Sequence, residues 1–328
     1  MLHLLRPDSK NKFSISNRTF LFWSSCTSAE TQDVLEQGLL SLFGSRDVSP
    51  DYGIEKIRRL FNSIYSGQLN ISDNDRFYIL GLSANAARIA VSYWDEMPLK
   101  DFAKNILQHF EDMEIVDTRL DKKPYSGLYS IVVSCISEEK VSDCKSKMPE
   151  LITKSIFSGT PYPTNMFLGC INRLRASKPL TITRAAILKA YLNRRKDNQQ
   201  KITTMLNPEN TNPGYLSGRL FAVIDKAQRQ ANGIQSIRER YLNSASAKPA
   251  AIFPTILKLS HHHRDKLSKG SAIYYDKLIQ EIMDQMGDSM PSMLSLEDQG
   301  RFFLGYYHQM QDFYKSNKSD DLEFTENK

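Results

Sequence analysis

The sequence has few of the features that mark secreted, membrane-spanning or metal-stapled proteins. Its 4 cysteines among 328 residues include no C-x-x-C pair. Disulfide frameworks and zinc ribbons need closer, paired cysteines, so we expect free thiols in a reducing compartment. The longest mainly apolar stretch, residues 128–136, is far shorter than the roughly 18 residues of a membrane span. The first eight residues reach charge and proline too early for a signal peptide, so a cytoplasmic protein without membrane contact is expected.

Short catalytic signatures are missing as well. The sequence contains no G-x-x-x-x-G-K-[ST] phosphate loop, no G-x-G-x-x-G, no G-x-S-x-G elbow, no H-E-x-x-H and no deaminase motif. These absences favour a protein that is not an enzyme and needs neither cofactor nor metal. Carboxylate nucleases carry no short signature, so a metal-dependent nuclease remains an alternative, as does a purely protein-binding helical scaffold.

The positive charge is concentrated in one block of the chain. The formal net charge is +6, but residues 161–240 hold 14 Lys and Arg against 4 Asp and Glu, a net of +10, whereas each flank has a net of −2. A nucleic-acid phosphate backbone is the commonest partner of such a block, because each neutralised phosphate releases counterions. The alternative is a solvated helix surface that faces an acidic neighbouring domain.

The periodicity predicts an α+β protein with a small antiparallel-sheet domain followed by a mainly α-helical bundle. The length suits about two domains. The first, residues 1–123, has strand candidates at 20–23, 77–82 and 87–94, the last two joined by a turn, and helix candidates at 33–43, 54–65 and 99–113.

The second domain, residues 124–315, has almost no strand signals. Helical spacing recurs at 163–176, 183–195, 213–231, 249–267, 273–286 and 296–315. Proline at 254 should either kink the fourth of these helices or mark its true start. A polar, frayed tail is expected from 316 to 328.

Four conspicuous motifs have structural explanations that we prefer to functional ones. Three adjacent imidazoles, His261–His263, diverge by about 100° each on a helix and cannot converge on one ion, so surface or phosphate-facing histidines are expected.

Ser295 and Asp298 have the spacing of a capping box, which we prefer to an acid–base role for Glu297 and Asp298. Asn212 is predicted to cap a helix, with backbone contacts to a sugar–phosphate chain as the alternative. An aromatic stripe predicts a bundle core or protein interface more than a base-stacking platform; it comprises Phe302, Phe303, Tyr306, Tyr307, Met310 and Phe313.

The basic residues of the block recur along helix faces, while apolar residues follow other stripes. Such helices would pack inward and follow a phosphate chain outward, with specificity for shape or backbone and not for bases. The residues predicted to contact nucleic acid are Arg184, Lys189, Arg194, Arg195, Lys196, Arg219, Lys226, Arg229, Arg238 and Arg240.

Several long segments resemble the large subunit of type I-C CRISPR–Cas surveillance complexes (Cascade). They are residues 77–88, 184–194, 207–221, 237–258 and 295–307, in the family's order, and the resemblance runs from about Phe13 to Tyr314. Family members are much longer, so the chain is expected to correspond to their C-terminal half, without the part that recognises the protospacer-adjacent motif.

The resemblance implies a non-catalytic subunit that helps an RNA-guided complex to bind and open duplex DNA in antiviral defence. Its implied partners are guide RNA, target DNA, backbone and small subunits, and a separately recruited helicase-nuclease. Residues 205–315 resemble the small subunit. Met205 is either an internal translation start that yields a separate small subunit or an ordinary linker methionine.

Overall fold

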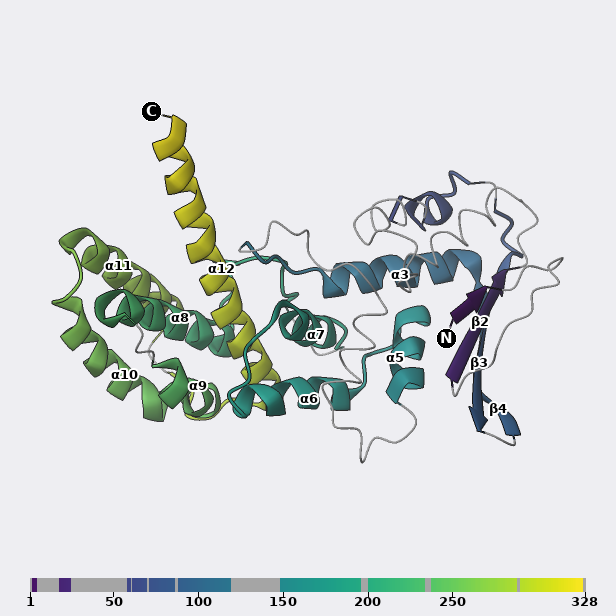
Figure 1. The fold of residues 1–328 in the computed structure, drawn as a ribbon, viewed down its shortest axis with the longest axis horizontal. Helices are drawn as coiled ribbons and strands as arrows, with labels where there is room; N and C mark the ends of the chain where they lie inside the picture. Colours follow the sequence, from purple (N-terminus) through teal and green to yellow (C-terminus); the bar gives the residue numbers. More distant parts are fainter. Residues whose placement is uncertain are drawn as a thin grey trace. The chain divides into compact units, whose positions relative to one another are not determined.

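The computed structural model describes ten segments of the chain (Figure 1). They are residues 2–4, 18–24, 58–59, 61–69, 71–85, 88–118, 148–195, 200–233, 237–287 and 290–326. The predicted helix 33–43 and three of the cysteines lie outside them, while Cys170 is a buried free thiol. The chain divides into a sheet unit, residues 1–112 with 126–163, and a helical unit, residues 113–125 with 164–328. The fold is therefore α+β, as the sequence predicts.

The sheet unit contains a sheet in the order β1-β2-β3-β4. The strands are β1 (Leu2–Leu4), β2 (Arg18–Ser24), β3 (Arg76–Asn85) and β4 (Arg88–Pro98). Antiparallel pairing of β2, β3 and β4 confirms the three predicted strands, and β1, which the sequence did not indicate, adds in parallel. The register of β3 and β4 shifts between Gly81 and Leu82, as at a β-bulge.

The core of the sheet unit is aromatic. Alternation along β3 turns Phe77 and Ile79 to a buried face. There Phe77 stacks on Phe102 of α3 (Leu99–Met113) with ring centroids 3.7 Å apart, and Phe102 lies 5.4 Å from Phe157 of α5 (Met148–Phe157). Helix α3 follows β4 directly, as predicted. Helix α5 was not predicted; it falls in the range assigned to the helical domain but belongs to the sheet unit.

The helical unit contains all six helices predicted for it. They are α6 (Thr164–Arg175), α7 (Ile182–Asn193), α8 (Pro213–Asn232), α10 (Pro249–Arg264), α11 (Lys269–Met286) and α12 (Leu296–Glu326). An additional short helix, α9 (Arg238–Ala247), was not predicted. Pro254 lies inside α10, so it does not mark the start of that helix. Helix α12 continues to Glu326, through most of the predicted polar tail. None of the described helices is long and apolar enough to cross a membrane.

Side-chain caps fix the starts of α8 and α12. The Asn212 side chain accepts a hydrogen bond from the Tyr215 backbone N–H (3.1 Å) at the start of α8, with Pro213 in the first helical position. Ser295 Oγ accepts from the Asp298 backbone N–H (3.1 Å) and donates to the Asp298 carboxylate (2.7 Å) at the start of α12. Both capping predictions are thus confirmed.

Helices α8 and α12 make the most extensive contact between described helices of the helical unit, and glycines permit their close approach (Figure 1). A Cβ added at Gly218 would lie 1.9 Å from the Phe302 carbonyl oxygen, and one at Gly305 would lie 2.1 Å from the Tyr215 carbonyl oxygen. The backbones touch, so no side chain fits at these positions. The aromatic stripe of α12 packs beside this contact and is buried along its whole length, which confirms it as core.

The glycine contact yields a stability prediction. Gly218→Ala should destabilise the protein by at least about 1–3 kcal/mol, because the backbone of α12 must move to admit the methyl group. Gly270→Ala is the matched control, since Gly270 lies in α11 with no atom near its added Cβ, and helix propensity should make this change neutral or stabilising by about 0.5–1 kcal/mol. Urea unfolding of both variants measures the difference. Equal stability of the two variants would contradict the close packing.

Candidate nucleic-acid interface

Four of the residues predicted to face nucleic acid are buried. Arg184, Lys189, Arg194 and Arg219 expose 6%, 2%, 7% and 5% of their surface. The expectation of an outward basic stripe is therefore wrong for these residues. Helix α7 contacts both α6 and α12, and α8 contacts α10, α11 and α12, so these central helices leave little surface for a stripe.

Arg219 is held by neighbouring helices. Its Nε donates to Gln309 Oε1 of α12 and one terminal nitrogen donates to Gln285 Oε1 of α11, both at 3.2 Å. Burial lowers the pKa of the guanidinium, so the amide oxygens compensate part of the cost of desolvating it. Arg219 thus links α8 to α11 and α12.

A buried histidine on α12 lies near Lys189. His308 Nδ1 is 2.9 Å from the Tyr215 hydroxyl, and the residue is 1% exposed. Burial, and to a smaller extent the positive charge of Lys189, lower the pKa of His308 to about 3. His308 is consequently neutral in the folded protein at neutral pH.

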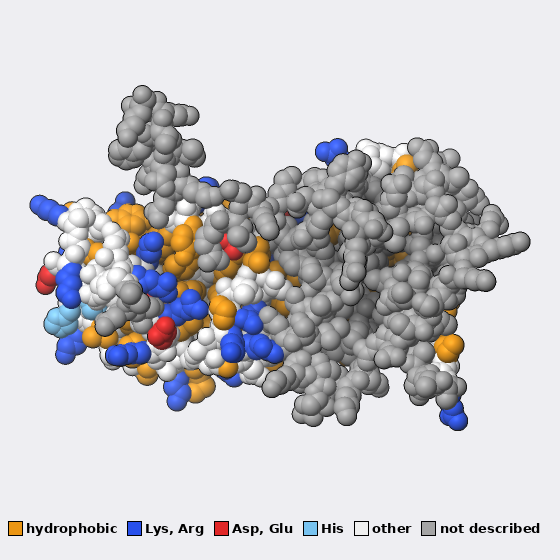
Figure 2. Space-filling model, viewed as in Figure 1, with side chains coloured by type: hydrophobic (Ala, Val, Ile, Leu, Met, Phe, Trp, Pro, Cys, Tyr) orange, Lys and Arg blue, Asp and Glu red, His pale blue; other side chains and the backbone are white. Residues whose placement is uncertain are grey.

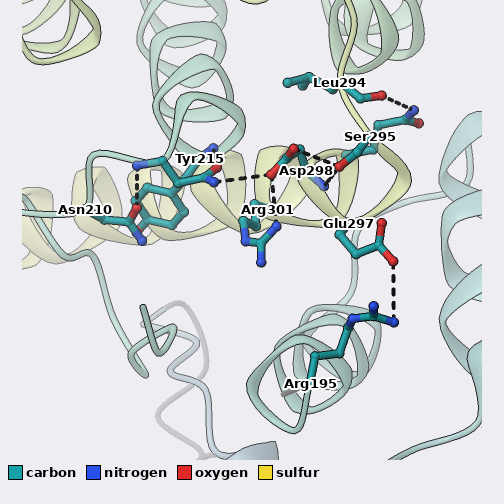
Figure 3. Close-up of polar contacts among 10 residues, drawn as sticks. Arg195, Asn210, Tyr215, Leu294, Ser295, Glu297, Asp298 and Arg301 are labelled. Atoms are coloured by element: carbon teal, nitrogen blue, oxygen red, sulfur yellow. Dashed lines mark hydrogen bonds and ion pairs between the residues drawn. The ribbon is translucent and has the colours of Figure 1, made fainter. Parts of the chain in front are cut away.

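Arg195 belongs to the junction where α8 and α12 begin (Figure 3). It lies 3.6 Å from the Glu297 carboxylate and donates to the Tyr191 hydroxyl (3.2 Å). Beside it, Asp298 Oδ1 accepts from Asn212 Nδ2 (3.2 Å) and from Arg301 (2.9 Å). The Asn212 and Asp298 side chains therefore link two helix starts.

The other predicted residues have varied surroundings. Lys226 Nζ lies 5.8 Å from the centre of the Tyr314 ring, a cation–π distance. Arg229 pairs with the fully buried Asp225 (2.7 Å), which also accepts from the Tyr306 hydroxyl (3.0 Å). Lys196 lies outside the described residues. Arg240, on α9, is exposed.

A surface groove of about 410 Å³ brings two of the predicted residues together. Arg229 at the end of α8 and Arg238 at the start of α9 line it, together with Lys178 from the turn that follows α6. Lys178 belongs to the basic block but lies between α6 and α7, so helix periodicity did not indicate it as a contact residue. Figure 2 shows Lys and Arg side chains predominating over Asp and Glu side chains on the visible described face of the helical unit.

The turn beneath this groove has a specific geometry. Ser177 has φ of 59°, and the N–H groups of Ser177 and Lys178 donate to the carbonyls of Leu174 and Arg173 (both 3.0 Å). This is a Schellman ending of α6 with serine in the left-handed position that glycine usually occupies. The ending directs the chain, and with it Lys178, to one side of the groove.

The three adjacent histidines do not gather on one ion. His261 and His262 are exposed, whereas His263 is half-buried near the side-chain nitrogens of Gln228 (3.3 Å) and Asn232 (2.6 Å). Within the described segments, no group of three His, Cys, Asp or Glu residues is arranged to hold a metal.

A family model described as CRISPR-associated protein (Cas_Csd1) matches residues 1–314. The chain belongs to this family. A comparison with curated proteins finds no match. The match to Cas_Csd1 covers both units, so the buried basic residues and the groove lie inside the family's region.

The buried cations of this Cas_Csd1 protein give a second stability prediction. Arg219→Ala should lower the free energy of unfolding by about 2–4 kcal/mol, because the buried Gln309 amide oxygen loses a charged donor and the packing of the buried side chain is lost. Arg240→Ala, which removes an exposed cation, should change it by no more than about 0.5 kcal/mol. Thermal and urea unfolding measure both values. If the two variants were equally stable, the structural role assigned to Arg219 would be wrong.

His308 gives a prediction for pH. Its folded pKa of about 3 lies below the ordinary 6.5, so the unfolded chain binds the proton first. The stabilisation is complete above pH 6.5 and is lost progressively as the pH falls towards 3. Between pH 7 and pH 5 the loss should be about 2 kcal/mol.

Asparagine at this position can still meet the Tyr215 hydroxyl but does not titrate. His308→Asn should therefore show a smaller loss of stability on acidification than the parent protein, while His262→Asn, at an exposed position, should show the same loss as the parent. Urea unfolding of the parent protein and both variants at pH 7 and pH 5 measures these losses of stability. Identical pH dependence in all three proteins would rule His308 out as the source.

Proposed function

We propose that this chain is a non-catalytic subunit of a type I-C CRISPR surveillance complex that binds nucleic-acid backbone and helps to open target DNA in antiviral defence. The observation that carries the proposal is a net +10 block within a chain of the Cas_Csd1 family. A concentrated positive charge suits a polyanion whose sequence another component reads.

The surroundings of the basic groups that remain at the surface support contact with phosphate more than contact with bases. Arginine and lysine at the surface supply charge, and the aromatic stripe of α12 that could have stacked on bases is buried. Guide RNA and target DNA are the proposed nucleic-acid partners. Backbone subunits, small subunits and a recruited helicase-nuclease are the proposed protein partners, with the helicase-nuclease performing cleavage.

Two alternatives differ in their experimental consequences. A metal-dependent nuclease would cleave single- or double-stranded DNA when Mg²⁺ or Mn²⁺ is added, whereas the proposed subunit should leave both intact. A purely protein-binding scaffold would assemble with the other subunits without changing their affinity for DNA. The Met205 internal start and the assignment to a C-terminal half remain predictions; Met205 itself is half-exposed between α7 and α8.

The decisive experiment assembles the surveillance complex with and without this chain. Target-DNA binding is measured by mobility shift, and strand opening by permanganate reactivity of unpaired thymines. We expect omission of the chain to abolish or strongly weaken both signals, and no cleavage by the chain with either metal. Undiminished binding and opening without the chain would refute the proposal, and metal-dependent cleavage would favour the nuclease.

A further inference from the structure

We infer that the groove between the turn after α6 and the start of α9 is a phosphodiester-binding site, with Lys178 and Arg238 as its contact residues. The inference rests on the proposed function, in that the ligand is a nucleic acid. The proposed site is this one groove and not a basic stripe along helix faces.

Cations from three separate segments converge on the groove. Lys178 follows α6, Arg229 ends α8 and Arg238 begins α9, and Glu239 is the acidic member of the described lining. Side chains so far apart in sequence meet only because the helices pack together. The positive charge is therefore focused on one concave surface, which raises the local potential for an anion.

The three cationic side chains of the groove differ in their exposure and surroundings. Arg229 lies 2.7 Å from Asp225, which is fully buried, so its charge is largely compensated within the protein. We assign Arg229 a positioning role as a wall of the groove. Lys178 is exposed and Arg238 is half-buried, and together they outweigh Glu239. Both side chains line the groove, so both can approach a phosphodiester that enters it.

Hydrogen bonds fix the walls of the groove relative to one another. Asn243 Nδ2 of α9 donates to the Arg175 carbonyl at the end of α6 (2.6 Å), and the Ile237 backbone N–H donates to Gln228 Oε1 of α8 (2.6 Å). The start of α9 is thereby attached to both neighbouring segments. A site held this way needs little ordering when it binds a ligand, which favours affinity. The positive end of the α9 dipole faces the same region and adds to the attraction.

The composition of the groove favours nucleic acid over an acidic protein segment. Protein interfaces place apolar or aromatic anchors at their centre. The described lining is instead mainly polar and charged, with Leu242 as its apolar side chain. Phosphodiesters need charge and hydrogen-bond donors and no apolar anchor.

The test measures binding of the purified full chain to fluorescent oligonucleotides over a range of NaCl concentrations. Single-stranded DNA, single-stranded RNA and duplex DNA of the same sequence form separate arms, which distinguish the source of the phosphodiester. The Lys178→Ala/Arg238→Gln variant should bind at least one of them about tenfold more weakly. The slope of log K against log[salt] should fall in magnitude by about 1.4–1.8, because two phosphate contacts are lost.

Matched variants separate the groove from general charge and from folding. Lys258→Ala/Lys269→Ala removes the same charge from exposed positions on α10 and α11 and should reduce the slope less. Glu239→Gln removes the groove's acid and should raise affinity about two- to fivefold. Lys178→Ala alone, at an exposed residue, should lower the slope by about half as much as the double variant without altering the unfolding temperature.

The outcomes are decisive in either direction. The inference is overturned if the groove variant and the Lys258/Lys269 control have the same affinity and salt slope in all three arms. It is also overturned if Lys178→Ala and Glu239→Gln change nothing, or if the groove variants lose binding to an acidic peptide such as poly-glutamate and not to nucleic acid. None of these results bears on whether the assembled complex needs the chain to bind and open target DNA. The oligonucleotide experiment therefore tests the groove, and the omission experiment tests the proposed function separately.

Discussion

The backbone contact between α8 and α12 is the constraint on which the helical unit depends. Gly218 lies against the Phe302 carbonyl and Gly305 against the Tyr215 carbonyl, so neither position accepts a side chain. At their starts, the two helices are joined by the hydrogen bond from Asn212 to Asp298. The aromatic stripe of α12 lies beside this contact and is buried, and α10 and α11 also pack against α8.

This packing explains why so much positive charge is buried. Residues on the central helices α7 and α8 face other helices on most sides, so Lys189 and Arg219 cannot reach solvent. Arg219 is compensated by two glutamine oxygens, and Asp225 is compensated by Arg229 and a tyrosine hydroxyl. Such groups are costly to bury and more costly to leave unpaired, so the bundle depends on the side chains that bind them.

The basic block consequently divides into two groups that the sequence presents as one. Its central members are buried in the bundle, and we propose that its peripheral members, at helix ends and turns, bind an anion. Lys178 and Arg238 are of the second kind, and they meet at a groove because a left-handed Ser177 turns the chain after α6 towards α9. The proposed phosphodiester site of this Cas_Csd1 protein therefore lies where helices end.

The sequence by itself determined the α+β class, the three antiparallel strands, six of the described helices of the second unit and the caps at Asn212 and Ser295. These features follow from local periodicity and from side chains a few residues away. It located the positive block but not its exposed part. Periodicity shows that Arg184 and Arg219 share faces with other cations, but it carries no information about which faces a neighbouring helix covers. Only the tertiary structure decided that, because burial is set by contacts between residues far apart in the chain, such as Gly218 with Phe302.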